Sequence, residues 1–136
     1  MSNSALFTNQ SFPMDLFPMT VTRIKKEIRG TYTFELDPGE TGFPFLPGQF
    51  NMLYVFGNGE IPISISGDPE RPDILVHTVR SVGKVSRALT RLRPGEVIGL
   101  RGPLGSSWPV QACKGKDILF VTGGLGLAPL RPAVHH

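Results

Sequence analysis

The chain has 136 residues, including 16 glycines and 13 prolines, and a formal net charge of +3. So much glycine and proline excludes a helical bundle and favours short strands joined by frequent turns. The basic residues are scattered among acidic ones instead of forming a long block, so the sequence predicts no nucleic-acid partner.

Cysteine content and hydropathy define the compartment that we expect. The single cysteine, Cys113, cannot form an internal disulfide and cannot by itself ligate zinc or an iron–sulfur cluster. No apolar run is long enough to cross a bilayer, and the N-terminus lacks the pattern of a signal peptide. We therefore expect a soluble, cytoplasmic protein without membrane insertion.

The first half of the chain alternates between strands and turns. Residues 1–18 are predicted to be a lead-in that lays Phe12, Leu16 and Phe17 over an apolar surface. The runs "VTRIKKEI" and "TYTFEL" flank an Arg-Gly turn and predict a hairpin. Further strands are predicted at "QFNMLYVF" and "IPISIS", which show period-two alternation, and at "DILVHTVR".

The second half adds one helix and a change of pattern. Apolar residues at helical spacing between Gly83 and Pro94 predict a short helix, and "VIGLRGPLG" predicts the sixth strand. Apolar "ILFVT" (118–122) then shows no alternation, which is typical of a buried parallel strand. We therefore predict an all-β fold: a six-stranded antiparallel Greek-key barrel over 19–112, followed at 113–136 by the first strand and turn of a truncated α/β nucleotide-binding domain.

The helix start is the first candidate site. Leading amides and the helix dipole favour an anion, so Gly83, Lys84, Val85 and Ser86 could hold a phosphate. The alternative is that Ser86 only caps the helix and Gly83 only ends a strand.

The strand "IPISIS" is the second candidate. Alternation puts Ser64 and Ser66 on one side and the isoleucines on the other, so a flat ligand such as a flavin ring could lie against the serine side. The alternative is an ordinary amphipathic strand whose serines face water.

The third candidate is "VTGGLGLAPL". Gly124 and Gly126 match the start of the dinucleotide fingerprint, while Pro129 replaces its last glycine and suits the first turn of a helix. Neither a metal-ligand set near His77 nor a nucleophile with an evident base occurs, so the sequence supports neither metal nor hydrolytic chemistry.

Taken in order, "IPISIS", "VHTVRSVGKVSRAL", "LRGPLG" and "VTGGLGLAPLRP" resemble the ferredoxin-NADP reductase superfamily. Within it, the chain is similar to the γ subunits of cytoplasmic nickel-iron hydrogenases, to anaerobic sulfite reductase B subunits and to the electron-transfer subunit of dihydroorotate dehydrogenase. The resemblance runs from about Val21 to the end. It implies that the barrel binds FAD and that a nucleotide domain follows.

The resemblance also implies roles for single residues. Ser64 would be the catalytic residue at the reactive edge of the flavin, and Ile61 stands where the family has an arginine for the flavin pyrophosphate. That departure leaves more of the phosphate binding to the helix start. The implied cofactor-binding residues for FAD are Pro62, Ile63, Ser64, His77, Thr78, Val79, Gly83, Lys84, Val85 and Ser86. Arg80 matches a basic position able to meet a phosphate of the nicotinamide cofactor, and Gly124, Gly126, Ala128 and Pro129 match the start of the NAD(P) site.

The implied function of the intact protein is electron transfer from NAD(P)H through FAD to a redox partner subunit of hydrogenase or sulfite reductase type. This chain lacks the cysteine cluster of that subgroup, so we expect no iron–sulfur cluster in it. As given, it is expected to bind FAD but not to oxidise NAD(P)H efficiently. The alternatives are a flavin-free interaction module of a redox complex and an oligonucleotide-binding barrel.

Overall fold

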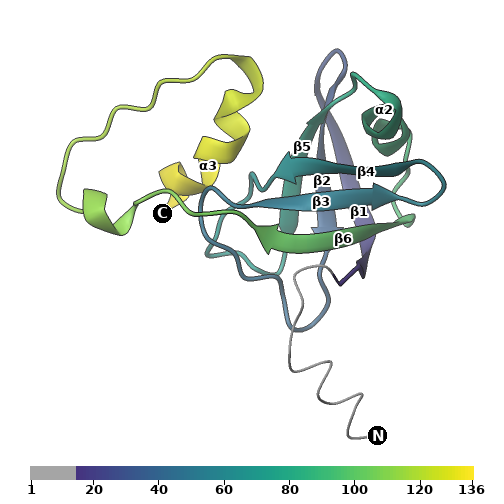
Figure 1. Ribbon diagram of the computed structural model, residues 1–136, viewed down its shortest axis with the longest axis horizontal. Coiled ribbons are helices and arrows are strands. Elements are labelled where there is room, and N and C mark those ends of the chain that lie inside the picture. Colours follow the sequence, from purple (N-terminus) through teal and green to yellow (C-terminus); the bar gives the residue numbers. More distant parts are fainter. Residues whose placement is uncertain (1–14) are drawn as a thin grey trace, which may run out of the picture.

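The computed structural model describes residues 15–136, which form a six-stranded antiparallel sheet with a short helix at one end (Figure 1). Neighbouring strands follow the order β4-β3-β6-β1-β2-β5. The elements are β1 (Phe17–Ile28), β2 (Thr31–Asp37), β3 (Phe50–Val55), β4 (Gly59–Ser64), β5 (Leu75–Arg80), α2 (Lys84–Thr90), β6 (Val97–Leu104), the 3-10 turns η1 (Gln111–Cys113) and η2 (Gly124–Gly126), and α3 (Leu127–His135). The predicted all-β fold is confirmed.

The first two strands form the predicted hairpin. Their register pairs Ile28 with Thr31 across a turn in which Gly30 has φ +79°, a conformation that favours glycine. Phe17, expected in the lead-in, instead begins β1, and the Leu16 side chain lies against Gly99 of β6. The rest of the lead-in, including Phe12, lies outside the described residues.

Alternating side chains from all the strands fill the space inside the curved sheet. Phe34, Leu53, Ile65 and Leu100 are among the fully buried core residues. The helix α2 closes one end of the core with Leu89, which is fully buried, while Val85, Ala88 and Leu92 pack around it. The periodicity between Gly83 and Pro94 thus marked the face of the helix that meets the core.

The two edge strands, β4 and β5, do not form a continuous ladder, so the sheet is not fully closed. They meet at an isolated antiparallel bridge between Ile65 and His77, and the Ser66 amide donates to the Val76 carbonyl at 3.0 Å. We call the line along which these two edges approach the seam. Beyond the bridge, toward α2, no ladder pairs β4 with β5.

The C-terminal segment differs from its prediction. Residues 118–122 form no strand, and Leu119 and Val121 are more than four-fifths exposed. A parallel strand needs at least one hydrogen-bonded neighbour, and no strand among the described residues pairs with this segment. The predicted helix does form as α3, with Pro129 in its first turn. No helix within 15–136 is long and apolar enough to span a membrane.

Candidate functional site

The outer face of β4 presents Pro62 and Ser64 at the seam. Pro62 is exposed and Ser64 half-buried, whereas Ile63 points inward against the core. The Ser64 hydroxyl has no hydrogen-bond partner within residues 15–136, although its carbonyl accepts a bond from His77. A half-buried hydroxyl without a partner is available to a ligand.

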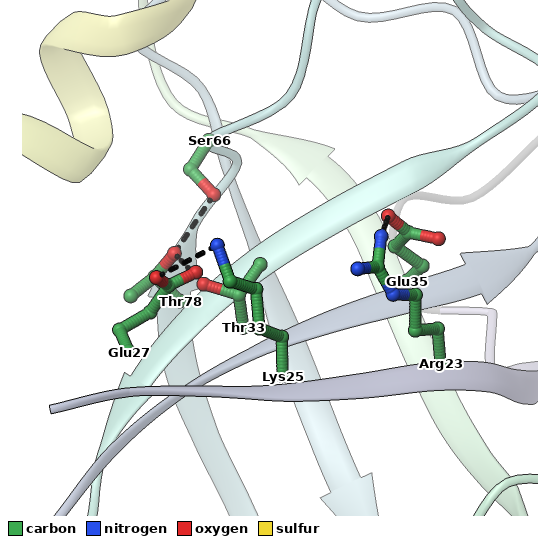
Figure 2. A network of polar contacts seen from close by, with 7 residues as sticks. All are labelled: Arg23, Lys25, Glu27, Thr33, Glu35, Ser66 and Thr78. Atoms are coloured by element: carbon green, nitrogen blue, oxygen red, sulfur yellow. Dashed lines mark hydrogen bonds and ion pairs between the residues drawn. The ribbon is translucent and has the colours of Figure 1, made fainter. Parts of the chain in front are cut away.

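Ser66 differs from Ser64, although the sequence predicted that both would face a ligand. Its side chain is buried, and its hydroxyl lies 3.4 Å from the Val76 carbonyl and 3.3 Å from the Thr78 hydroxyl. Thr78 in turn meets the Thr33 hydroxyl at 3.0 Å, so the three hydroxyls form a short chain (Figure 2). Ser66 thus lies on the same side as Thr78, but its hydroxyl is engaged by Thr78 and Val76 and is not free for a flavin ring as that of Ser64 is.

The outer face of β5 carries Thr78 and Arg80, while His77 and Val79 face the interior. The two residues of the bridge, Ile65 and His77, lie opposite each other and both have side chains that face inward. The adjacent residues Ser64 and Thr78 therefore both face outward. Arg80 is exposed beyond them, toward α2. The fully buried side chains of His77 and Val79 cannot touch a ligand on this face, and only their backbone borders it.

His77 is held inside the barrel by two hydrogen bonds. One ring nitrogen, Nδ1, lies 3.0 Å from the Ser64 carbonyl, and the other, Nε2, lies 3.1 Å from Nδ2 of Asn51. Burial lowers the pKa of His77 to about 4, because the core does not solvate the imidazolium form. The histidine is therefore neutral at physiological pH.

The first turn of α2 closes the other end of the seam. The Val85 side chain lies against Gly59, the first residue of β4, so the helix starts beside the beginning of that strand (Figure 1). Ser64 lies five residues along β4, about 16 Å away at ordinary strand rise. Ser64, Thr78, Arg80 and the start of α2 thus border one seam.

The Ser86 hydroxyl is occupied by its own turn. It accepts bonds from the amides of Val82 at 2.9 Å and Gly83 at 2.8 Å. The capping alternative is therefore correct for this side chain. Any anion at the helix start would meet backbone amides and Lys84, which is exposed.

Ser86→Ala is expected to lower the free energy of unfolding of the ligand-free protein by about 1–2 kcal/mol, because two amides lose their acceptor. Urea unfolding without added flavin measures this loss. The control is Ser107→Ala in an exposed loop, which should change little. A Ser86→Ala protein as stable as the wild type would contradict the capping role.

The glycine turn before α3 lies over the outer face of the barrel. Gly124 and Ala128 line a groove of about 560 Å³ together with Thr78 and Ser66. Arg131 of α3 donates to the Ser66 carbonyl at 2.7 Å, which ties the helix to the end of β4. Gly126 and Pro129 face a different hollow, and the Pro129 carbonyl accepts from the Trp108 indole at 2.9 Å.

Charged pairs surround this groove. Lys25 and Glu27 are 3.4 Å apart, and Arg23 and Glu35 are 3.2 Å apart (Figure 2). A hydrogen bond from Thr33 is the main reason that the pKa of Glu27 lies below its usual range. These pairs are largely exposed, so each contributes little to stability.

Sequence reasoning missed two residues of this region. Asn51 shares the inward face of β3 with Leu53 and Val55, and a polar residue at such a position was a visible signal. Arg131 gave no signal, because its contact with Ser66 joins residues 65 positions apart.

Comparison with known proteins agrees with this geometry. The family described as oxidoreductase FAD-binding domain matches residues 19–108. The chain belongs to this family. The match covers α2 and the six-stranded sheet apart from the first two residues of β1, so the part of the chain that builds the seam is the family's FAD-binding domain.

Two curated relatives of this FAD-binding domain illustrate its setting. Sulfhydrogenase 2 subunit gamma of Pyrococcus furiosus is 39% identical over 92 residues, which are 68% of this chain and 32% of that subunit. A probable dihydroorotate dehydrogenase B (NAD(+)), electron transfer subunit, of Methanocella arvoryzae is 36% identical over 113 residues, 83% of this chain and 40% of that subunit. The chain thus spans a third to two fifths of the length of these relatives.

Solved structures show the same fold. A ferredoxin NADP+ reductase from Neisseria gonorrhoeae with bound FAD and NADP has a TM-score of 0.77 at 23% identity, over 89% of this chain and 51% of that one. An Amycolatopsis cytochrome P450 reductase has a TM-score of 0.74 at 26% identity, over 88% and 38% of the two chains. Both likenesses extend past the barrel into the C-terminal segment.

The residues along the seam fit a flavin dinucleotide. A free hydroxyl at Ser64 suits the polar edge of a ring, and Arg80 and Lys84 have no ion-pair partner among residues 15–136. Position 61, where the resemblance would place an arginine for the flavin pyrophosphate, holds an isoleucine whose side chain packs against the core. β4 therefore supplies no basic group for the pyrophosphate at that position.

Proposed function

We propose that FAD binds along the seam, with its ring against Ser64 and Thr78 and its diphosphate at Arg80, Lys84 and the first amides of α2. The observation that carries this proposal is the arrangement of polar groups along the seam. The half-buried Ser64 hydroxyl, which has no hydrogen-bond partner among residues 15–136, lies at one end, and the basic side chains of Arg80 and Lys84, which have no ion-pair partner there, lie toward the other. An extended ligand with a polar ring edge and a charged phosphate end matches that separation.

Each part of the site has a separate task. The Ser64 hydroxyl would orient the ring by a hydrogen bond to its polar edge. The amides of Lys84 and Val85, with the Lys84 and Arg80 side chains, would offset the phosphate charge. Bound FAD supplies the exchange between hydride transfer and single-electron transfer.

The turn with Gly124, Gly126, Ala128 and Pro129 would begin the NAD(P) site. Its groove is shared with Thr78, so a nicotinamide bound at this turn would approach the same face of β5 as the flavin. We further propose that NAD(P)H is the electron donor. The acceptor would be a redox subunit of hydrogenase type, as the name of the sulfhydrogenase relative suggests, or of sulfite reductase type, as the sequence resemblance implies. The lone Cys113 is consistent with work in the reducing cytoplasm.

The test compares FAD with riboflavin, which lacks the diphosphate. The purified chain is expected to bind one FAD, visible in its flavin absorption bands. Arg80→Gln and Lys84→Gln should each weaken FAD binding about tenfold while leaving riboflavin binding unchanged. Arg93→Gln, in an exposed turn, is the matched control.

Two outcomes would contradict the proposal. A colourless protein that does not take up added FAD would favour the flavin-free interaction module. Equal losses for FAD and riboflavin in the Arg80 and Lys84 variants would place the phosphates elsewhere.

A further inference from the structure

A chain of two hydrogen bonds crosses the interior of the barrel beneath the seam. It joins Asn51 of β3 to His77 of β5 at 3.1 Å and His77 to the Ser64 carbonyl of β4 at 3.0 Å. Asn51 and His77 are both fully buried. Buried polar groups of this kind cost stability unless they are paired, so their presence needs a reason.

The proton positions follow from the partners. A carbonyl oxygen can only accept, so Nδ1 of His77 carries the hydrogen and donates to Ser64. Nε2 of the neutral ring then has a free lone pair, which accepts from Nδ2 of Asn51. The Ser64 carbonyl therefore selects the tautomer, and Asn51 holds the tilt of the imidazole.

The space around Asn51 leaves it little freedom. A β-carbon on Gly102 would overlap Oδ1 of Asn51, so only glycine leaves room for the amide at that point of β6. Oδ1 itself has no hydrogen-bond partner within the described part of the chain. The amide is thus held by packing on one side and by His77 on the other.

The imidazole bonds to Ser64 at the point where pairing between β4 and β5 ends. The two strands share a single bridge, at Ile65 and His77, and no continuous ladder joins them. His77 therefore supplies a side-chain donor that holds the Ser64 carbonyl from inside the barrel. The carbonyl and the hydroxyl of Ser64 belong to one residue, so fixing the carbonyl limits the directions in which the hydroxyl can point.

We propose that His77 is a positioning residue: held by Asn51, it fixes the main chain of Ser64 and thereby aims the Ser64 hydroxyl at the flavin ring. The inference rests on the FAD site proposed above. His77 itself touches no ligand, because its ring lies wholly inside the barrel.

Two substitutions separate the two hydrogen bonds. In His77→Asn, the amide nitrogen lies near the place of Nδ1, so the donor to Ser64 is kept and the partner of Asn51 is lost. In His77→Gln, the amide oxygen can lie near the place of Nε2, so Asn51 keeps its acceptor and Ser64 loses its donor. Asn is one methylene smaller than Gln, so the larger packing loss falls on His77→Asn, which is opposite to the difference expected from the hydrogen bonds.

The readouts are the FAD dissociation constant and the reduction potential of the bound flavin. We expect His77→Gln to bind FAD about tenfold more weakly and to shift the potential, and His77→Asn to stay near the wild type. In a Ser64→Ala background the two variants should become equal, because no hydroxyl remains to be aimed.

The outcomes distinguish this inference from the site on which it rests. If Ser64→Ala alone leaves both readouts unchanged, the proposed ring position is wrong. If Ser64→Ala changes them but His77→Asn and His77→Gln behave alike, only the positioning role is wrong.

A measurement on the unaltered apo protein covers the case in which a variant does not fold. Nitrogen-15 NMR of the His77 ring should show the proton on Nδ1 and a coupling across the hydrogen bond to the Ser64 carbonyl. A neutral ring protonated on Nε2 would overturn the inference.

Discussion

Gly102→Ala is expected to lower the free energy of unfolding by about 3–5 kcal/mol, the sum of overpacking and backbone strain. The new β-carbon would overlap Oδ1 of Asn51 and lie 2.9 Å from its Cγ and 3.3 Å from the Phe50 carbonyl oxygen. Asn51 cannot move aside without breaking its bond to His77. Gly102 also has φ +153°, where side chains are disfavoured.

The control for this change is Gly95→Ala. Gly95 has φ +97°, but a methyl group added there would have no neighbouring atom within 4 Å, so this variant tests the backbone cost without the collision. We expect a loss of only about 1 kcal/mol there. Urea unfolding of both variants measures the difference, and equal losses would show that the space beside Asn51 can adjust.

Acid is expected to unfold the ligand-free protein through His77. The pKa falls from 6.5 to about 4 on folding, so between these values the unfolded chain binds more protons than the folded one. Stability from the neutral ring is complete above pH 6.5 and is lost progressively as the pH falls toward 4. The difference corresponds to about 3 kcal/mol as an order of magnitude.

The measurement is the free energy of unfolding at several pH values across this window. His77→Asn, which cannot titrate at this position, should flatten the slope there. A variant that keeps the wild-type slope would assign acid sensitivity to other groups.

The alternation of side chains was enough to predict the barrel. Phe34 and Leu36 of β2 and Leu53 and Val55 of β3 point inward, as period two requires. The helix was found because Leu89 and its neighbours recur at the spacing of one helical face. These features depend on residues close in sequence, which is why the sequence alone could reveal them.

The rest depended on contacts between distant parts of the chain. Ser66 looked like Ser64 in sequence, yet Thr78 and Arg131 cover it in the fold. The segment 118–122 had the composition of a buried strand, but backbone pairing requires neighbours that no local pattern can supply. The order of the four motifs, in contrast, predicted the FAD-binding family correctly.

The extended segment 118–122 has a practical consequence for work with this chain. Its uncharged, β-prone side chains and unpaired backbone groups resemble the short windows from which cross-β aggregates grow. Lys116 and Asp117 immediately before it are the charged gatekeepers that oppose such stacking. High salt screens those charges, so concentrated stocks should remain monodisperse longer in dilute buffer.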